Sequence, residues 1–200
     1  RLTDTEEIRE FIKENGFGIL INSVNGKLWA THIPMLMVKD KDQKDILTGH
    51  LSKANPQWNA FGKSPEVLAI FPGPHSYISS SWYDHENVPT WNYLAVHLYG
   101  TIRIIEGAEL KEELSRIVDK YEAVMPNPVS VETMSEKFVE SEIKGIVGFK
   151  ISITEIHAAT KLSQNRDDKN VKRIIDGLEN QGDQDSVTMA KIMRERRPLK

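Results

Sequence analysis

Asn25-Gly26 is the feature that most constrains the fold, because this dipeptide favours the tight turn of a two-residue β-hairpin. Runs rich in β-forming residues flank it at 17–23 and 27–34, so these runs are expected to pair as antiparallel strands. Further strands are predicted at residues 46–51, 67–71, 93–105 and 146–158. Short turns join most of them. The sequence therefore predicts a mostly antiparallel sheet, and closure into a barrel would remove its exposed edges.

Amphipathic helices are predicted between the strands and in the C-terminal tail. The apolar spacing indicates helices over residues 3–14, 53–61, 107–121 and 132–143, and two more around residues 171–178 and 189–193. Strands with inserted helices give an α+β class. No alternating βαβ pattern with a Gly-rich loop is present, which argues against a Rossmann site. We expect a barrel domain over residues 1–166 and a helical extension over residues 167–200, packed on the barrel or on a partner subunit.

The composition excludes several classes of function. The chain of 200 residues has a formal net charge of −3, which argues against a protein that coats DNA by neutralising phosphates. It has no cysteine, so disulfides, thiolate nucleophiles and zinc–thiolate sites are excluded. No apolar run approaches the roughly 20 residues of a membrane span, and no secretory pattern opens the chain. The expected location is therefore cytoplasmic.

The segment over residues 73–100 concentrates flat side chains with polar tips. Its rings include Trp82, Tyr83, Trp91 and Tyr93, together with His75, His85 and His97. Such rings are useful where one face must be apolar and one edge must hydrogen-bond. We expect this segment to form a wall of a site for a flat heterocycle, a dimer interface, or both.

Polar residues gather where predicted strands end. Ser52 and Lys53 follow a strand and run into a predicted helix, which suits an anion site, although Ser52 or Asn55 could simply cap that helix. The segment Lys161-Leu162-Ser163-Gln164-Asn165-Arg166 follows the last strand. Its cations suit a phosphate and its amides suit a heterocycle edge, but a plain polar loop fits the composition equally well.

Three other patterns carry weaker signals. The histidine spacing does not match a metal site, and no metal is expected. Ser79-Ser80-Ser81 lacks the surroundings of a nucleophilic serine. The basic C-terminus could touch nucleic acid, although cations that end a helix are the commoner explanation. Its members are Arg194, Arg196, Arg197 and Lys200.

Several of these segments together resemble the PaiB family, described as FMN-binding negative transcriptional regulators. The resemblance is ordered and covers nearly the whole chain. It is carried by ATHIP (30–34), TGHLSKANPQW (48–58), GPHSYISSSWY (73–83), VPTWNYLAVHLYG (88–100), KGIVGF (144–149) and KLSQNR (161–166). The resemblance implies an FMN-binding split β-barrel, similar to pyridoxamine-phosphate oxidases and flavin reductases. It also implies a homodimer with FMN at the subunit interface, and a role in repressing protease synthesis and sporulation genes.

The resemblance and the side-chain chemistry together give a set of expected FMN-binding residues. Lys53 and Ser52 are expected at the phosphate, with Arg166 as a second cation. Near the ribityl chain or the ring we expect Thr31, His32 and His50, and Asn55 is included from the same motif. The isoalloxazine is expected to meet Trp91, Asn92, Gln164 and Asn165 of the partner subunit.

Alternative functions remain open from the sequence. The protein could be a flavin-dependent oxidoreductase or flavin reductase with only an indirect regulatory effect, but no catalytic residue can be assigned. It could be a binding or dimerisation module for another ligand such as haem. Direct operator binding through the basic tail is a further alternative, and a strong salt dependence would mark it.

Overall fold

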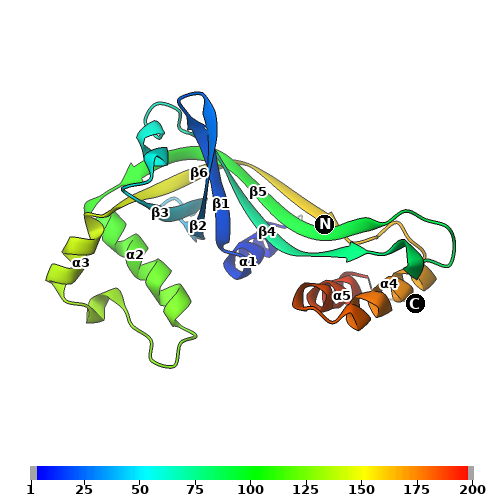
Figure 1. Ribbon diagram of the computed structural model, residues 1–200. Coiled ribbons are helices and arrows are strands. Elements are labelled where there is room, and N and C mark those ends of the chain that lie inside the picture. Colours follow the sequence, from blue (N-terminus) through cyan, green and yellow to red (C-terminus); the bar gives the residue numbers. More distant parts are fainter. Residues whose placement is uncertain (1–3, 198–200) are drawn as a thin grey trace. The chain divides into compact units, whose positions relative to one another are not determined.

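The structure, a computed structural model, describes residues 4–197 (Figure 1). The chain divides into two compact units, each made from segments far apart in the sequence. Unit 1 comprises the residues up to Ile8, Pro72–Val96 and the residues from Ala158 onward. Unit 2 comprises Arg9–Phe71 and His97–His157. The expected division into a barrel domain and an extension after residue 166 stays a prediction.

Six strands form a closed barrel in the order β1-β2-β3-β6-β5-β4. The strands are β1 (Phe17–Val24), β2 (Lys27–Lys39), β3 (Asp45–Ser52), β4 (Glu66–Ile78), β5 (Thr90–Ile105) and β6 (Ile146–Lys161). β1 pairs antiparallel with β2 and with β4, and β3 pairs antiparallel with β2 and with β6. The predicted antiparallel barrel is confirmed. β4, β5 and β6 each contribute residues to both units.

The Asn25-Gly26 turn sets the register of the first hairpin. Both residues have positive φ, 52° for Asn25 and 78° for Gly26, as a type I′ turn requires. β2 extends to Lys39, beyond the predicted end at residue 34, because it changes partner along its length. It pairs with β1 up to Pro34, and from Met35 onward with β3.

The aromatic segment differs from its predicted form, because most of it is strand. β4 continues to Ile78 and β5 begins at Thr90, which leaves only residues 79–89 as a loop, with a short 3₁₀ turn at Ser80–Trp82 (η2). Pro72 and Pro74 made a longer β4 look improbable, because proline cannot donate to a ladder. The alternation of burial nevertheless resumes beyond them, with Ser76 and Ile78 buried.

Five α-helices and two further 3₁₀ turns complete the described elements. They are α1 (Thr5–Glu14), η1 (Pro56–Ala60), α2 (Gly107–Glu122), η3 (Val131–Thr133), α3 (Glu136–Ile143), α4 (Asp168–Gln181) and α5 (Gln184–Arg196). The helix expected over 53–61 is reduced to η1, which starts at Pro56, a residue tolerated only in a first turn. No helix within residues 4–197 is both long and apolar enough to span a bilayer.

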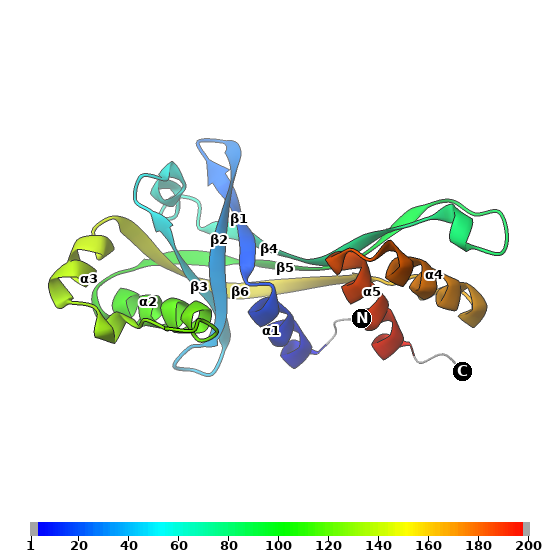
Figure 2. The same ribbon diagram turned by 60° about the horizontal axis from the view of Figure 1, so that its bottom comes forward.

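The core of unit 2 lies inside the barrel and under α2. Phe61 and Phe149 meet there edge to face, with ring centroids 6.1 Å apart. Gly148 of β6 leaves room for α2, since a Cβ at this position would lie 2.4 Å from Cδ1 of Leu110. Figure 2 shows α2 alongside the strands of this unit. Its apolar face therefore closes one side of the barrel.

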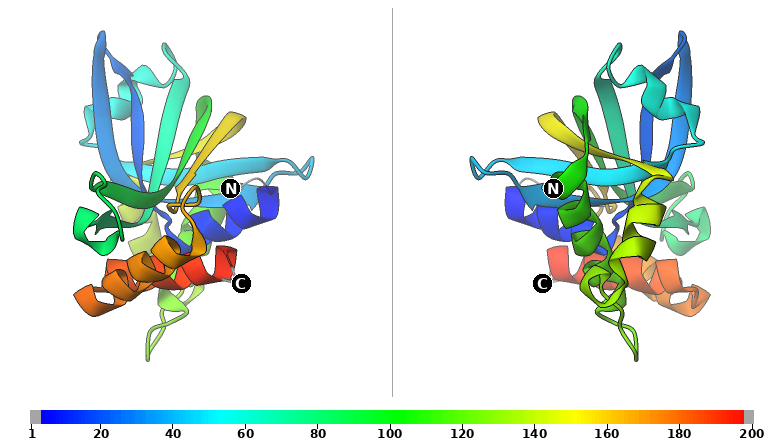
Figure 3. Two further views of the ribbon diagram at one scale, coloured as in Figure 1. Left: turned by 90° about the vertical axis from the view of Figure 1, so that its right-hand side faces the viewer. Right: turned by 90° about the vertical axis from the view of Figure 1, so that its left-hand side faces the viewer.

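Unit 1 is built on two helices that lie side by side (Figure 3). The turn between them contains Gly182, which has φ 77°, and Asp183, whose side chain caps α5 by accepting from the Ser186 backbone N–H. Gly177 of α4 is required by packing, because a Cβ there would lie 2.5 Å from a ring carbon of Trp82. The loop after β4 is thus held directly on α4.

Candidate functional site

Lys53 is fixed by its backbone and open at its side chain. Its N–H donates to the Gly145 carbonyl at 2.8 Å, and its carbonyl accepts from Nε1 of Trp58 at 2.9 Å. Its side chain is exposed and makes no ion pair with any residue in the described part of the chain. A rigid backbone with an unpaired ammonium group is a suitable anchor for an anionic group.

Asn55 links the turn after β3 to β2. Its Nδ2 donates to Oγ1 of Thr31 at 2.9 Å, and its Oδ1 accepts from the Gln57 backbone N–H at 3.0 Å. Asn55 therefore caps η1, which was the structural alternative considered for this motif. It brings two of the expected residues, Thr31 and Asn55, into direct contact.

Gln57 was not expected at this site, although it lies within the same motif. Its Nε2 donates to the Leu20 carbonyl at 3.0 Å, while its Oε1 is buried without a hydrogen-bond partner. Nothing in the sequence separated this residue from an exposed helical glutamine. Burial next to β1 gives it a fixed position and an unused acceptor.

His50 and Ser52 lie two residues apart on β3 and therefore share one face of the strand. Nδ1 of His50 is buried without a hydrogen-bond partner, and burial lowers the pKa of this imidazole below its usual value. The ring is thus neutral at pH 7, and its buried Nδ1 has unused hydrogen-bonding capacity. Oγ of Ser52 accepts from the Ala54 N–H at 3.3 Å, and its O–H remains a donor.

His32 lies on β2 directly opposite Ile19 of β1. Its ring is exposed and lies 6.2 Å from the Phe17 ring, centroid to centroid. An exposed aromatic pair of this kind can cover one side of a flat ligand. The expected residues of unit 2 thus provide an ammonium group, a hydroxyl group and two imidazoles.

Asn92 of unit 1 is fully buried, and both of its polar groups are engaged. Nδ2 donates to Sδ of Met193 at 3.4 Å, and Oδ1 accepts from Oγ of Ser163 at 3.0 Å. These bonds tie β5 to α5 and to the segment that follows β6. The structure therefore gives Asn92 a clear packing role.

Trp91 points to the opposite face of β5 and is about half exposed, at 52%. Its ring lies 6.1 Å from His75 and 5.8 Å from Tyr77, both on β4. Tyr77 was not expected at the site. Side chains two residues apart on a strand point to the same face, which brings these rings together. The sequence would have indicated this contact only if β4 had been predicted to continue beyond Phe71.

The segment after β6 lines a cavity of about 400 Å³ in unit 1. The Arg166 guanidinium lies 5.1 Å from the centre of the Tyr83 ring, a cation–π contact, and also donates to Oδ1 of Asn87 at 3.4 Å. The Gln164 side chain accepts from the Leu162 N–H and donates to the Thr160 carbonyl. Asn165 is exposed on the cavity wall.

The expected residues therefore fall into two groups, one in each unit. Unit 2 contains Thr31, His32, His50, Ser52, Lys53 and Asn55; unit 1 contains Trp91, Asn92, Gln164, Asn165 and Arg166. Within residues 4–197, no three His, Asp or Glu side chains are arranged to hold a metal ion.

The barrel architecture is shared with solved flavoproteins. The FAD and heme binding protein of Mycobacterium smegmatis matches with a TM-score of 0.58 and 13% identity, covering 80% of this chain and 72% of that chain. The flavocytochrome Anf3 of Azotobacter vinelandii matches with a TM-score of 0.58 and 18% identity, covering 79% and 67%. At such identities the likeness defines the fold, which is a split β-barrel.

Sequence comparison gives the family. The model described as "Putative FMN-binding domain" matches residues 1–155. The "Protease synthase and sporulation protein PAI 2" of Bacillus subtilis is 47% identical over 196 residues, covering 98% of this chain and 94% of that protein. An uncharacterized protein of Emericella nidulans is 27% identical, covering 96% and 93%. The chain belongs to the PaiB family of FMN-binding-domain proteins, and FMN is the cofactor that this family implies.

Proposed function

We propose that unit 2 holds FMN at the ends of β2 and β3, with its phosphate on Lys53. The observation that carries this proposal is the fixed Lys53 backbone combined with an ammonium group that has no ion pair among residues 4–197. The Ser52 hydroxyl adds a neutral donor beside it. These groups fit the phosphate, and the unpartnered Nδ1 of His50 fits a polar edge of the cofactor.

FMN supplies redox chemistry when it is bound, and the protein's part is to orient it. His50 is neutral because burial disfavours its cation, so it can donate or accept one hydrogen bond without adding charge. Thr31 is positioned by Asn55, and His32 offers an exposed ring. This arrangement leaves the chemistry to the cofactor and the orientation to the protein.

The proposed assembly is a homodimer with FMN at the subunit interface. The exposed Trp91 ring of one copy and its Gln164, Asn165 and Arg166 side chains would meet the flavin held by the other copy. Trp and Tyr rings are enriched at such interfaces, and both Trp91 and Tyr77 are partly exposed. The packing bonds of Asn92 would hold Trp91 in position rather than contact the flavin.

The proposed role of the FMN-bound dimer is negative regulation of protease synthesis and sporulation genes. It is supported by the name of the Bacillus subtilis relative. The C-terminal arginines give little net positive charge for a direct DNA contact, because each lies beside a carboxylate: Arg194 pairs with Glu179, Arg197 with Asp168, and Arg196 lies 3.9 Å from Glu7. Lys200, the fourth cation of this tail, lies outside the described residues. The regulation is therefore proposed to act through the flavoprotein as a whole.

The test is a titration of the protein with FMN and with riboflavin, which lacks the phosphate. Loss of a charge-assisted bond costs about 1.5–3 kcal/mol, so Lys53→Ala should weaken FMN binding roughly 10- to 100-fold. Riboflavin affinity should barely change. Lys137→Ala, which removes an exposed lysine of α3, is the matched control and should bind both ligands normally.

If Lys53→Ala weakened the binding of FMN and of riboflavin equally, Lys53 would not be the residue that binds the phosphate. A wild-type protein that retains no flavin spectrum would contradict the FMN site altogether. A reporter for protease synthesis then tests the regulation: repression by Lys53→Ala at wild-type strength would separate it from FMN. Turnover of NAD(P)H by the FMN-loaded protein would favour the oxidoreductase alternative.

A further inference from the structure

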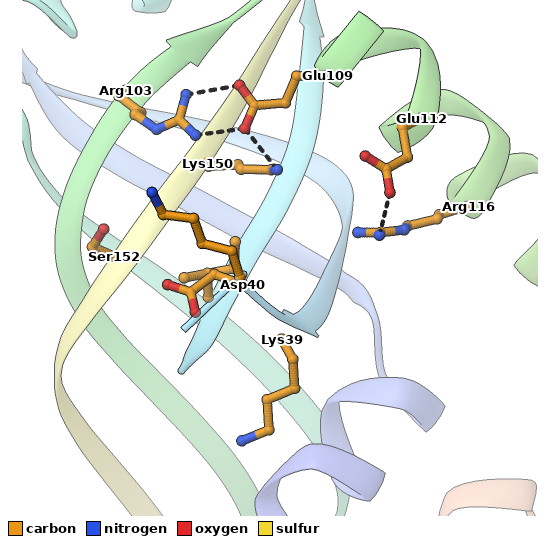
Figure 4. Close-up of a pocket in the computed structure, with 10 residues that line it drawn as sticks. Lys39, Asp40, Arg103, Glu109, Glu112, Arg116, Lys150 and Ser152 are labelled. Atoms are coloured by element: carbon orange, nitrogen blue, oxygen red, sulfur yellow. Dashed lines mark hydrogen bonds and ion pairs between the residues drawn. The ribbon is translucent and has the colours of Figure 1, made fainter. Parts of the chain in front are cut away.

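A charged cavity of about 670 Å³ lies in unit 2 and shares no lining residue with the Lys53 region (Figure 4). Its walls come from the end of β2 and the turn after it, and from β3, β5, α2 and β6. Its volume falls within the roughly 300–1,000 Å³ that is typical of small-molecule sites. The family and its cofactor do not account for this cavity.

Cations outnumber carboxylates on the cavity wall. The cations are Lys39, Lys41, Arg103, Arg116 and Lys150; the carboxylates are Asp40, Glu109 and Glu112. This local excess is opposite in sign to the net charge of −3 on the chain. An excess positive charge of this kind attracts anions to the cavity.

The central carboxylate is shared between two cations. Glu109 accepts from both terminal nitrogens of Arg103, at 3.0 and 2.5 Å, and from Nζ of Lys150 at 2.8 Å (Figure 4). These donors lower the pKa of Glu109 to about 2, so it is ionised at neutral pH. One carboxylate therefore occupies the place where two cations converge.

The other three cations differ in their partners. Lys39 pairs with Asp45, which lies outside the cavity lining, at 3.1 Å. Arg116 meets Glu112 at 2.6 Å, one turn away on the same helix. Lys41 makes no ion pair with any residue in the part of the chain that the structure describes. The Ser152 hydroxyl on the wall adds a neutral donor.

The two guanidinium groups are open to solvent while they pair with carboxylates. The Arg103 side chain is 58% exposed and that of Arg116 is 39% exposed, so an anion from solvent can reach both. Lys150 is different, because its side chain is only 16% exposed and its ammonium group is held at the cavity floor. A ligand with oxygens placed like those of Glu109 would meet one largely buried ammonium group and two partly exposed guanidinium groups.

We propose that this cavity binds a small anion carrying two or more phosphate or carboxylate groups, held by Arg103, Lys150 and Arg116. Each guanidinium group can grip one anionic group with two parallel N–H donors. Lys150 contributes a point charge between them. A second anionic group is needed because a single one would gain little over the Glu109 carboxylate that it replaces.

The experiment measures binding of inorganic pyrophosphate and of citrate to the full chain, with FMN present at saturation and ionic strength held constant by NaCl. At ten times the dissociation constant, either ligand should raise the melting temperature by roughly 3–6 °C. Inorganic monophosphate should bind at least tenfold more weakly. The ratio of the dissociation constants of pyrophosphate and citrate shows whether the cavity prefers phosphate or carboxylate groups.

Variants test the residues. Arg103→Gln and Arg116→Gln should each raise the dissociation constant roughly tenfold or more. Glu109→Gln should lower it, because the competing carboxylate charge is removed. Lys137→Gln removes one exposed charge of α3 and is the matched control, with no expected change. Melting curves without ligand establish that each variant folds.

Three outcomes would overturn the proposal. If pyrophosphate bound with equal affinity to Arg103→Gln, Arg116→Gln and Lys137→Gln, its binding would reflect only the overall charge of the protein. Loss of pyrophosphate binding when FMN is saturating would place both ligands in one site. Tighter binding of an oligonucleotide than of pyrophosphate, at equal phosphate concentration, would assign the surface to nucleic acid instead.

Discussion

The two units treat their buried polar side chains differently. In unit 1, the buried serine and asparagine side chains within the described residues all take part in hydrogen bonds: Ser76 with Ser186, Asn92 with Ser163 and Met193, and Asn170 with Asp84 and Asp167. The buried hydroxyl of Tyr83 in the same unit has no partner. In unit 2, Asn22, Gln57 and Glu113 are buried with at least one polar atom unpartnered. The buried hydroxyl of Thr48, also in unit 2, does have a partner, because it donates to the Phe149 carbonyl.

This difference separates polar groups that stabilise the fold through hydrogen bonds from polar groups that could still form a hydrogen bond. A satisfied buried group is costly to remove because its partner loses its bond. An unsatisfied buried group already carries that cost, and a ligand, a water or a proton can relieve it. Mutations at matched positions in the two units should therefore have opposite consequences.

The largest effect is expected for Asn92→Leu in unit 1. The substitution leaves Oγ of Ser163 without its acceptor and places an apolar side chain in a polar environment. We expect a loss of about 2–3 kcal/mol in the free energy of unfolding, measured by chemical denaturation. Asn165→Ala in the same unit is exposed and should stay within about 0.5 kcal/mol of wild type. Equal effects of the two would show that the buried bonds of Asn92 contribute nothing.

An effect of opposite sign is expected for Glu113→Gln in unit 2. Glu113 is 1% exposed, and burial raises the pKa of its carboxyl above the ordinary value of 4.5, although the neighbouring Thr48, Arg116 and Lys150 act in the opposite direction. The charged form therefore destabilises the folded state. The glutamine variant should be more stable at pH 7 by about 1–3 kcal/mol, a rise of roughly 2–12 °C in melting temperature.

The pH dependence of that gain follows from the direction of the shift. Because the folded pKa lies above the unfolded one, the cost of the charge appears as the pH rises through the interval between them. The advantage of Glu113→Gln should therefore be larger at pH 7 than at pH 4, which lies below the ordinary pKa of 4.5. An advantage that is the same at both pH values would mean that ionisation of Glu113 is not its cause.

The smallest effect is expected for Asn22→Leu, the same substitution as at Asn92 but in unit 2. Neither polar atom of the Asn22 side chain has a hydrogen-bond partner, so no bond is broken when it is replaced. The free energy of unfolding should stay within about 1 kcal/mol of wild type. A loss as large as that of Asn92→Leu would reveal a bound water that satisfies Asn22 in solution.

Much of the fold could be predicted from local patterns. The Asn25-Gly26 turn, the alternation in β6 and the apolar stripe of α2 each point to one structure, and the barrel combines them. The extension of β4 through Pro72 and Pro74 could not be predicted, because proline within a run argues against a strand and only the partner strands decide otherwise. Tyr77 was missed for this reason.

The site residues named from the sequence stay predictions, and the sequence shows the positions of exposed polar groups more readily than those of buried ones. Lys53 and Asn55 stand in a motif whose turn chemistry is visible in the sequence. Glu113 looked like one more acid near the start of a helix, although its spacing from Leu110 and Ile117 puts it on the apolar stripe. That spacing was a usable signal, whereas nothing local distinguished Gln57.

The composition of unit 1 has a consequence for how the chain folds during synthesis. Its aromatic strands and loop lie in Pro72–Val96, yet the helices that bury Ser76, Trp82 and Asn92 come from the residues after Ala158. Contacts between such distant segments form late, and a growing chain emerges from its N-terminus first. Ser76, Trp82 and Asn92 therefore lack their contacts with α4 and α5 until the residues after Ala158 have been synthesised. Over that interval this segment depends most on chaperones.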